Sequence, residues 1–293
     1  MSTLSKLITN IDKIASEGKT DTGIPGLAAV KGTIPEHKLS GLYEPMINLV
    51  IQGSKRLNIG EKVFNYSPAT YFVMSVDLPA TGEVFSDDKT GAPYMAIALT
   101  INSALVAEIL EAVDFSALKS ANAGFGVGEM SEQLMDAWGR LVDLINSSGD
   151  TGYLAQLYEK ELLYLTLLGS QGAVLRDIAQ HGSVLKQIHK AIEWIRANYK
   201  IPVAISQLAD LTGMSEASFF RKFKAITALS PIQYQKQMRL LEARRLLIET
   251  DMNAGSVCFE VGYESHSQFT REYTRFFSRP PLKDAKYIKE LFC

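Results

Sequence analysis

The sequence contains few of the residues that build metal centres and disulfide frameworks. Its 293 residues include only two cysteines, Cys258 and Cys293, and four histidines. Two cysteines exclude a disulfide-rich scaffold and a cysteine-based zinc site, and such usage is typical of a reducing compartment. His37 is the only histidine between residues 24 and 100. We therefore expect no metal ion in that segment, because a metal-binding barrel needs histidine and carboxylate ligands on neighbouring strands.

The chain also lacks a long apolar run. No segment approaches the roughly 18–20 apolar residues that a membrane-spanning helix needs. Residues 1–19 have no apolar stretch followed by small cleavage-site residues, so no signal peptide is expected. The spacing of Leu4, Leu7, Ile8 and Ile11 predicts a short amphipathic helix there instead. These features favour a cytoplasmic protein without a membrane partner.

Motifs of the common enzyme classes are missing as well. We find no G-x-S-x-G sequence, no Walker loop and no Cys–His pair in one segment. The glycines of "GFGVGEM" (124–130) follow no clear strand, so we expect a flexible loop rather than a nucleotide-binding turn. A barrel enzyme is a rival interpretation, but it requires converging titratable groups that the sequence does not offer. We expect neither an enzyme nor a cofactor.

Positive charge is scarce in the front of the chain and concentrated at its back. Residues 1–180 hold 13 Lys and Arg against 21 Asp and Glu, a net charge of −8. Residues 181–293 hold 17 against 11, a net charge of +6. A basic segment attracts polyanions. Unless the charges are scattered by chance, the split predicts that only the back of the chain meets a nucleic acid.

Short extended patterns fill residues 24–100, and helical patterns follow. Runs such as "MINLVIQG" (46–53) and "TYFVMSVDLP" (70–79) are rich in β-branched and aromatic residues and end at Gly or Pro. Asn102 is expected to cap the first later helix. Further helices are predicted at 130–146, 152–168, 184–199, 205–212, 215–226, 231–250, 254–261, 265–277 and 281–291. The sequence thus predicts an α+β protein, with an N-terminal antiparallel β jelly roll that carries helices and an all-α C-terminal domain.

Two segments near the end of the chain share one short pattern. "ASFFRKFK" (217–224) and "SQFTREYTRFF" (267–277) each place an aromatic residue two positions before an arginine and another two positions after it. Each follows a short helix and a glycine turn, at Gly213 and Gly262, and each has a serine in position to cap the helix. Helix, turn and second helix form the helix-turn-helix pattern. The chain is predicted to carry it twice.

Helical spacing gives each of these helices a buried and an outward face. Arginine can bond guanine in bidentate fashion, Ser, Thr and His can bond bases or phosphates, and apolar groups can touch thymine methyls. The alternatives are ordinary helical hairpins with solvated arginines and an architectural DNA binder that ignores sequence. The predicted DNA-binding residues are the outward ones: Ala217, Phe220, Arg221, Lys224, His266, Ser267, Thr270 and Arg271.

The segments "LADLTGMSEASFFRKFKAITALSPIQYQKQMRLLEARRLL" and "VGYESHSQFTREYTRFFSRPP" resemble the DNA-binding domain of the AraC/XylS transcription regulators, over about residues 186–290. The front segments "YEPMINLVIQGSKRLNIG", "SVDLPATGEV" and "QGAVLRDIAQHGS" resemble the N-terminal domain of one AraC-type subgroup. The resemblance implies a bacterial regulator with a cupin-like sensor or dimerisation domain. Its partners would be double-stranded DNA, a small-molecule effector, a second copy in a homodimer, and RNA polymerase if it activates transcription.

The sequence departs from the family pattern at two helix ends. Ala228 and Ser278 stand where the family usually has glycine. If these positions need a left-handed backbone, each departure costs about 1 kcal/mol. The expected effect is on stability rather than on DNA binding.

The resemblance and the glycines together divide the chain into three ranges. Residues 1–168 are expected to form the sensor or dimerisation domain, 169–185 a linker with a hinge, and 186–293 the DNA-binding domain. Aromatic residues of the front range are candidates for a ligand pocket, although each alone is more simply core, and Asp77 could contact a polar effector or fix a turn. The candidate ligand-binding residues are Tyr43, Phe64, Tyr66, Tyr71 and Asp77.

Overall fold

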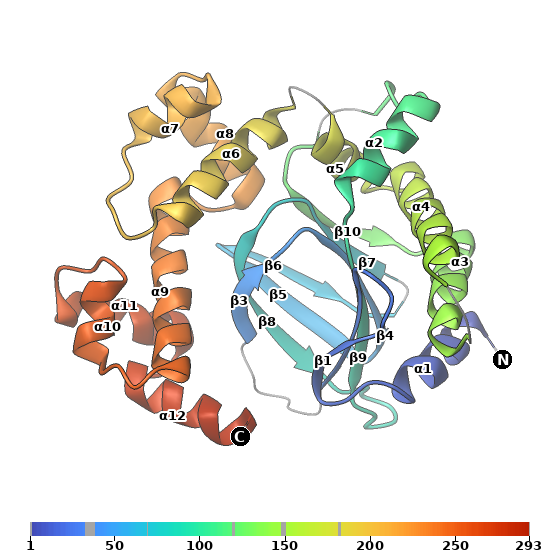
Figure 1. The fold of residues 1–293 in the computed structure, drawn as a ribbon, viewed down its shortest axis with the longest axis horizontal. Coiled ribbons are helices and arrows are strands. Elements are labelled where there is room, and N and C mark those ends of the chain that lie inside the picture. Colours follow the sequence, from blue (N-terminus) through green and yellow to red (C-terminus); the bar gives the residue numbers. More distant parts are fainter. Residues whose placement is uncertain are drawn as a thin grey trace.

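Two antiparallel β-sheets face each other as a barrel in the front half of the chain (Figure 1). The computed structural model describes residues 2–32, 39–68, 70–118, 121–147, 151–180 and 183–292. In this part of the chain the strand orders are β1-β2-β9-β4-β7-β10 and β3-β8-β5-β6. The strands are β1 (Gly18–Asp21), β2 (Leu27–Gly32), β3 (Leu39–Tyr43), β4 (Met46–Gln52), β5 (Ser54–Ile59), β6 (Lys62–Tyr66), β7 (Thr70–Met74), β8 (Leu78–Phe85), β9 (Tyr94–Thr100) and β10 (Phe125–Glu129). The predicted α+β fold with a β jelly roll in front is confirmed.

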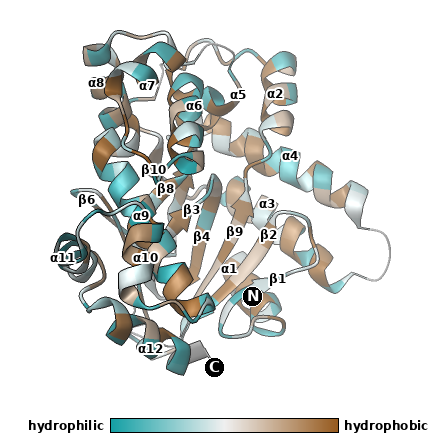
Figure 2. Cartoon of the chain, turned by 60° about the vertical axis from the view of Figure 1, so that its left-hand side comes forward, coloured by the Kyte–Doolittle hydropathy of each residue, from teal (hydrophilic) through white to brown (hydrophobic). Residues whose placement is uncertain are grey.

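Alternation along the strands directs side chains into two separate cores. In β7, Tyr71 and Val73 pack against covering helices, whereas Phe72 and Met74 face the barrel interior. Successive side chains of a strand point to opposite faces, so a strand buried on both sides has an unbroken apolar sequence. Figure 2 shows the central strands β4 and β9 of the larger sheet mostly in brown, whereas α4 and α9 alternate between brown and teal.

Helices α1 to α5 cover the outer face of the six-stranded sheet. They are α1 (Thr3–Asp12), α2 (Ser103–Ala112), α3 (Glu132–Asp143), α4 (Gly152–Leu168) and α5 (Gly172–Ala179), with a 3-10 turn at Leu144–Asn146. Asn102 caps α2 as predicted, because its side chain accepts the N–H groups of Ala104 and Leu105. Trp138 of α3 is fully buried in this outer core. Among the described residues, no helix is long and apolar enough to cross a membrane.

The glycine-rich segment 124–130 is a strand, and the prediction of a flexible loop is wrong. β10 pairs with β7 along its whole length. Neighbouring side chains leave no room for a Cβ at two of its glycines. A Cβ at Gly126 would collide with Gln171, and one at Gly128 would collide with the ring of Tyr71. Glycine inside a strand often marks such an approach.

The back half is entirely helical within the described residues. Its helices are α6 (Val184–Ala197), α7 (Ile205–Thr212), α8 (Glu216–Thr227), α9 (Pro231–Glu249), α10 (Ala254–Glu260), α11 (His266–Phe277) and α12 (Pro281–Phe292). We call α7 and α8 the first helix pair, and α10 and α11 the second. The long helix α9 lies between the two pairs and beside the barrel (Figure 1).

Serine caps and left-handed ends fix both helix pairs. Ser215 accepts the N–H of Ser218 at the start of α8, and Ser265 accepts that of Gln268 at the start of α11. Gly213 ends α7 in the left-handed conformation, at φ 66°. The repeated pattern in the sequence thus corresponds to a repeated local structure.

The barrel and the first helix pair share one hydrophobic core. Leu78 and Phe125 of the barrel belong to the same buried cluster as Phe219, Phe223 and Ile226 of α8. The second pair has a separate core with α9 and α12, which contains Leu240, Val257, Phe269 and Tyr273 among others. The first helix pair is therefore packed against the barrel, whereas the second is packed only against other helices of the back half.

Polar contacts reinforce the junction between the barrel and the first helix pair. Arg196 of α6 donates to Oδ2 of Asp77 at 2.7 Å, and the Tyr234 hydroxyl of α9 donates to the Asp77 carbonyl at 2.8 Å. The backbone N–H of Gly124 donates to the carbonyl of Ile226 at 3.0 Å. Asp77 thus joins the two halves of the chain.

The described part of the expected linker is packed rather than extended. In α5, Val174 and Leu175 belong to the outer core of the barrel. The buried Arg176 and Asp177 pair with each other at 2.7 Å, and Asp177 accepts the N–H of Ala121. Of the glycines behind the hinge hypothesis, Gly182 lies outside the described residues.

Candidate nucleic-acid interface and ligand cavity

The outward face of α8 is a row of exposed side chains. Phe219 and Phe223 are fully buried, with ring centroids 5.5 Å apart, and they anchor the helix. Helical spacing then turns four of the predicted DNA-binding residues to solvent. All four are exposed: Ala217, Phe220, Arg221 and Lys224.

The outward face of α11 is built in the same way. Phe269 and Tyr273 are buried, and Phe277 completes the core where Phe276 is only partly covered. The other predicted DNA-binding residues gather around one surface hollow, which Thr274 and Arg275 also line: His266, Ser267, Thr270 and Arg271. The Thr270 hydroxyl oxygen is buried and has no hydrogen-bond partner among the described residues.

The arginines of the back half fall into two groups. Arg196 and Arg244 form ion pairs with Asp77 and Asp284, and Arg239 donates to three backbone carbonyls. In contrast, Arg221 and Arg271 take part in no ion pair within the described ranges. The arginines on the two outward faces are therefore available for phosphates or guanine edges.

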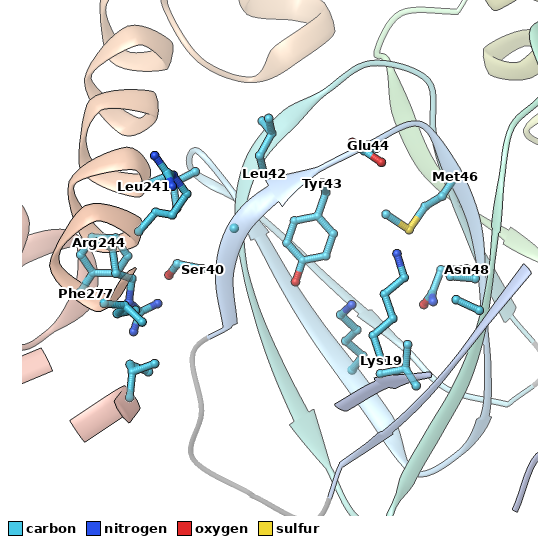
Figure 3. Close-up of a pocket in the computed structure, with 18 of the residues that line it drawn as sticks. Lys19, Ser40, Leu42, Tyr43, Glu44, Met46, Asn48, Leu241, Arg244 and Phe277 are labelled. Atoms are coloured by element: carbon cyan, nitrogen blue, oxygen red, sulfur yellow. The ribbon is translucent and has the colours of Figure 1, made fainter. Parts of the chain in front are cut away.

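A cavity of about 1030 Å³ lies between the barrel and the helices α9 and α12. The space is open because small side chains line it, among them Ala28, Ser40 and Ala98 on three strands. Figure 3 shows Tyr43, Lys19 and other barrel residues on one side, and residues of the C-terminal helices on the other. Since both halves of the chain line the cavity, a bound molecule would touch both.

The charged groups of the cavity differ in their partners. Arg244 is held by both oxygens of Asp284, and Arg245 is held by Glu242 and Glu249. On the barrel side, Lys19 and Lys55 have no ion-pair partner in the described parts of the chain. On this side the two lysines outnumber the carboxylate that lines the cavity with them, Glu44.

Of the five predicted ligand-binding residues, only Tyr43 lines this cavity. Phe64 and Tyr66 belong to an aromatic cluster with Phe72 and Phe125. Tyr71 lies on the opposite face of its strand, in the outer core, because alternation turns it away from the interior.

Asp77 neither faces the cavity nor merely fixes a turn, since it is buried and pairs with Arg196. Burial raises the pKa of its carboxyl group, while the charges of Arg196 and His189 oppose that shift. Sequence reasoning had not placed this residue at the contact between the two halves.

Sequence reasoning missed most of the polar residues of the cavity, among them Lys19, Asn48 and Lys55. A signal for Lys55 exists in the sequence. Lys55, Leu57 and Ile59 alternate along β5 and share one face, and the two apolar residues are buried inside the barrel. A lysine on a buried face requires an explanation.

Thiol and metal chemistry receive no support from the described residues. Cys258 is fully buried in the core of the second helix pair, and burial raises the pKa of its thiol. A reactive thiol needs a lowered pKa. No group of three or more His, Cys, Asp and Glu could hold a metal ion in the described ranges, and His37 lies outside them.

Two family models match the chain. One, for the N-terminus of AraC-type transcriptional regulators, matches residues 23–174, just over half of the chain. The other, a helix-turn-helix domain, matches residues 208–286. The chain therefore belongs to the AraC-type transcriptional regulators, which confirms the family that its motifs indicated.

Curated relatives include transcription activators. RhaS of Pectobacterium carotovorum is 25% identical over 150 residues, which are 51% of this chain and 52% of RhaS. The virulence regulon activator VirF of Yersinia enterocolitica is 28% identical over 141 residues, 48% of this chain and 52% of VirF. The chain spans about half the length of the curated relatives it matches.

Solved structures of ToxT from Vibrio cholerae resemble both halves together. One has a TM-score of 0.57 at 8% identity and covers 89% of this chain and 97% of its own. Another, of ToxT bound to an unsaturated fatty acid, has a TM-score of 0.54 at 8% identity, with 87% and 92% covered. At such low identity the likeness shows the fold alone.

Proposed function

We propose that the protein is a sequence-specific DNA-binding regulator in which α8 and α11 are recognition helices for successive major grooves. The observation that carries this proposal is the pair of matched outward faces, each with an arginine that has no ion-pair partner among the described residues. The eight outward residues predicted from the sequence would make the base and phosphate contacts. The positive charge of the back half would add phosphate affinity.

The spacing of the helix pairs supports this proposal. The 19-residue helix α9 is about 28 Å long. Successive major grooves on one side of DNA are about 34 Å apart. A helix of this length between the two pairs suits simultaneous insertion of α8 and α11.

The cavity is the proposed effector site. It is lined by Tyr43, Lys19 and Lys55 of the barrel and by Leu241 and Ile288 of the C-terminal helices, among others. A ligand that contacts both halves can favour one arrangement of them over another, and that difference in affinity is the basis of control. The fatty acid held by a ToxT structure supports a ligand with an apolar body and a polar end.

The domain ranges, the oligomeric state and the cellular location are part of the same proposal. We retain a sensor domain in residues 1–168 and a DNA-binding domain in 186–293, joined through 169–185. The exposed apolar residues Tyr153 and Leu157 on α4 support a homodimer. A cytoplasmic location is part of the same proposal. Contact with RNA polymerase would follow if the protein activates transcription.

Binding to the protein's own upstream DNA and to scrambled DNA, at about 150 mM salt, tests the proposal directly. Arg221→Ala and Arg271→Ala should each weaken specific binding by about 1–3 kcal/mol, because each removes a base contact. Non-specific binding should change far less.

Lys286→Ala is the matched control, because it also removes one positive charge from the back half. Lys286 lies on α12 and pairs with Glu290 at 3.7 Å, so it belongs to neither outward face. An equal loss in all three variants on both DNAs would identify a non-specific DNA binder. If the upstream DNA and a genomic selection both yield no preferred sequence, the proposal is wrong.

A further inference from the structure

The helical wall of the cavity belongs to one part of the back half. It runs from Leu241 of α9 through Phe277 at the end of α11 to Ile288 of α12, and among the described residues it includes none from α6, α7 or α8. The same segments form the core of the second helix pair, with Leu240, Phe277 and Ala285 among its buried residues. A molecule in the cavity would therefore touch the barrel and the second helix pair's core, but not the first helix pair.

The first helix pair is packed directly against the barrel. A Cβ at Gly124 would lie 3.0 Å from Cγ2 of Ile226, and one at Gly60 would lie 3.2 Å from Cδ2 of Leu229. By contrast, the core of the second helix pair contains no barrel residue in the part of the chain that the structure describes. A second hollow lies between β5, β6 and β8 and the end of α11. The second helix pair can therefore shift against the barrel with less loss of packing than the first.

Three side chains connect the cavity to the buried face of α11. Arg244 and Asp284 both line the cavity, and the Arg244 guanidinium donates to Oδ2 and Oδ1 of Asp284 at 2.9 and 3.0 Å. The hydroxyl of Tyr273, a fully buried anchor of α11, donates to the same Oδ2 at 2.9 Å. Hydrogen bonds to a buried charged group are strong. The position of Tyr273 is therefore coupled to that of the cavity wall.

The other end of α11 is tied to the rest of the back half. Arg239 of α9 donates to the backbone carbonyls of Tyr199, Lys200 and Gly262. Tyr199 and Lys200 follow α6, whereas Gly262 forms the turn before α11. The start of α11 is thus held by this cluster, and its end is held by the wall of the cavity. A change at the cavity would tilt α11 about its start.

We propose that the effector acts on one of the two proposed recognition helices, α11, and that Asp284 and Tyr273 are the positioning residues that carry its effect. Occupation of the cavity shifts Asp284 relative to the barrel, Tyr273 follows, and the outward face with Arg271 turns. The first helix α8 keeps its place against the barrel. The effector thus changes the second DNA contact and leaves the first. The inference rests on the proposed function and names the way in which the cavity regulates it.

Bulk introduced into the cavity by substitution takes the place of the ligand in the test. Ser40 of β3 lines the cavity on the side that faces α9 (Figure 3). Ser40→Trp in the full-length protein should change the affinity for its specific DNA by about 5-fold or more. The change should persist in an Arg221→Ala background and should largely disappear with Arg271→Ala, because only α11 is displaced. Ala98→Trp fills the same cavity from β9 and is the second variant.

Two tyrosine variants test the connection itself. Tyr273→Phe removes only the hydroxyl that bonds Asp284, so it should reduce the effect of Ser40→Trp at least several-fold. Tyr234→Phe is the matched control, because it also removes one buried hydroxyl bond, to the Asp77 carbonyl, and should leave that effect unchanged. Equal reductions by the two variants would overturn the role of Tyr273. Thermal melting of each variant checks its folding.

Hydrogen exchange of the wild-type protein tests the inference without any variant. At low denaturant concentration the amides of α10, α11 and α12 should open together, on the order of 10-fold more often than those of α8. A common opening of α8 and α11 at every denaturant concentration would overturn the inference.

The outcomes for this inference and for the proposed function are separable. Failure to select any DNA sequence contradicts the proposed function, whereas the exchange measurement needs no DNA. Selective DNA binding that Ser40→Trp and Ala98→Trp leave unchanged, or change only through Arg221, would keep the proposed function and overturn the inference.

Discussion

At the scale of single residues, two adjacent phenylalanines of α8 have opposite roles. Phe219 is fully buried in the core shared with the barrel, whereas Phe220 is 41% exposed on the outward face. The side chains are identical, so any difference between them arises from position alone. Helical geometry places them on opposite sides of α8.

Phe219→Ala and Phe220→Ala should therefore have different effects. Phe219→Ala is expected to lower the free energy of unfolding by about 3–5 kcal/mol, because it leaves a cavity in the core. Phe220→Ala should change stability by less than about 0.5 kcal/mol. It should instead weaken specific DNA binding, because it removes an apolar contact. Denaturant unfolding and DNA titration of the two variants measure both effects.

Similar destabilisation by both substitutions would show that Phe220 packs in the native protein. Unchanged DNA binding by Phe220→Ala would remove this residue from the proposed reading face.

At the scale of elements, the ends of α8 and α11 carry backbone strain. Ala228 has φ 59° and Ser278 has φ 62°, so both adopt the left-handed conformation that favours glycine. This confirms the expected departures at the helix ends. Both helices are thus formed at a cost that glycine would avoid.

Ser278→Gly should raise the free energy of unfolding by about 0.5–1 kcal/mol, because glycine adopts positive φ without steric cost. Ser278 is exposed, so little packing is lost. Ser278→Ala keeps the Cβ and is the matched control that should not stabilise the protein. A gain for alanine equal to that for glycine would contradict the strain argument. Thermal or denaturant unfolding measures the difference.

Helices were easier to predict from the sequence than strands. α8, α9 and α11 have apolar periodicity and capping residues, so their ranges were predicted to within about two residues. β10 was mistaken for a loop, because its glycines are required by neighbours from distant parts of the chain.

The outward faces could be predicted for the same reason that the helices could, since helical spacing is a local property. The cavity could not, because it is formed by strands and helices far apart in sequence. The placement of Tyr71 also depended on which face of β7 turned inward, and an unbroken apolar run does not reveal that.

At the scale of the whole molecule, Asp77 joins the barrel to the helical back half through Arg196 and Tyr234. Asp77→Ala should loosen this contact by about 1–3 kcal/mol, because it removes the acceptor of a charged hydrogen bond. Asp77→Asn keeps an acceptor oxygen and should cost less. Hydrogen exchange in α6 measures the loosening.

The pH dependence of the two variants provides a further check. Burial raises the pKa of Asp77 above its unfolded value, because the charge of Arg196 only partly offsets the cost of burying the ionised carboxyl group. The contribution of this pKa shift to stability is therefore complete below the unfolded pKa and is lost as pH rises through the native pKa. Asp77→Asn should remove that loss. Identical exchange in wild type and both variants would show that Asp77 does not hold the halves together.

The division of the back half between two hydrophobic cores limits where genetic recombination can join segments of related proteins. The start of α9, with Tyr234, belongs to the core shared with the barrel, whereas Leu240 and Leu247 belong to that of the second helix pair. In terms of cooperative folding units, the molecule therefore divides inside α9. A genetic recombination at 169–185 would deprive the first helix pair of about half its core, so the barrel and the first helix pair are expected to be inherited together.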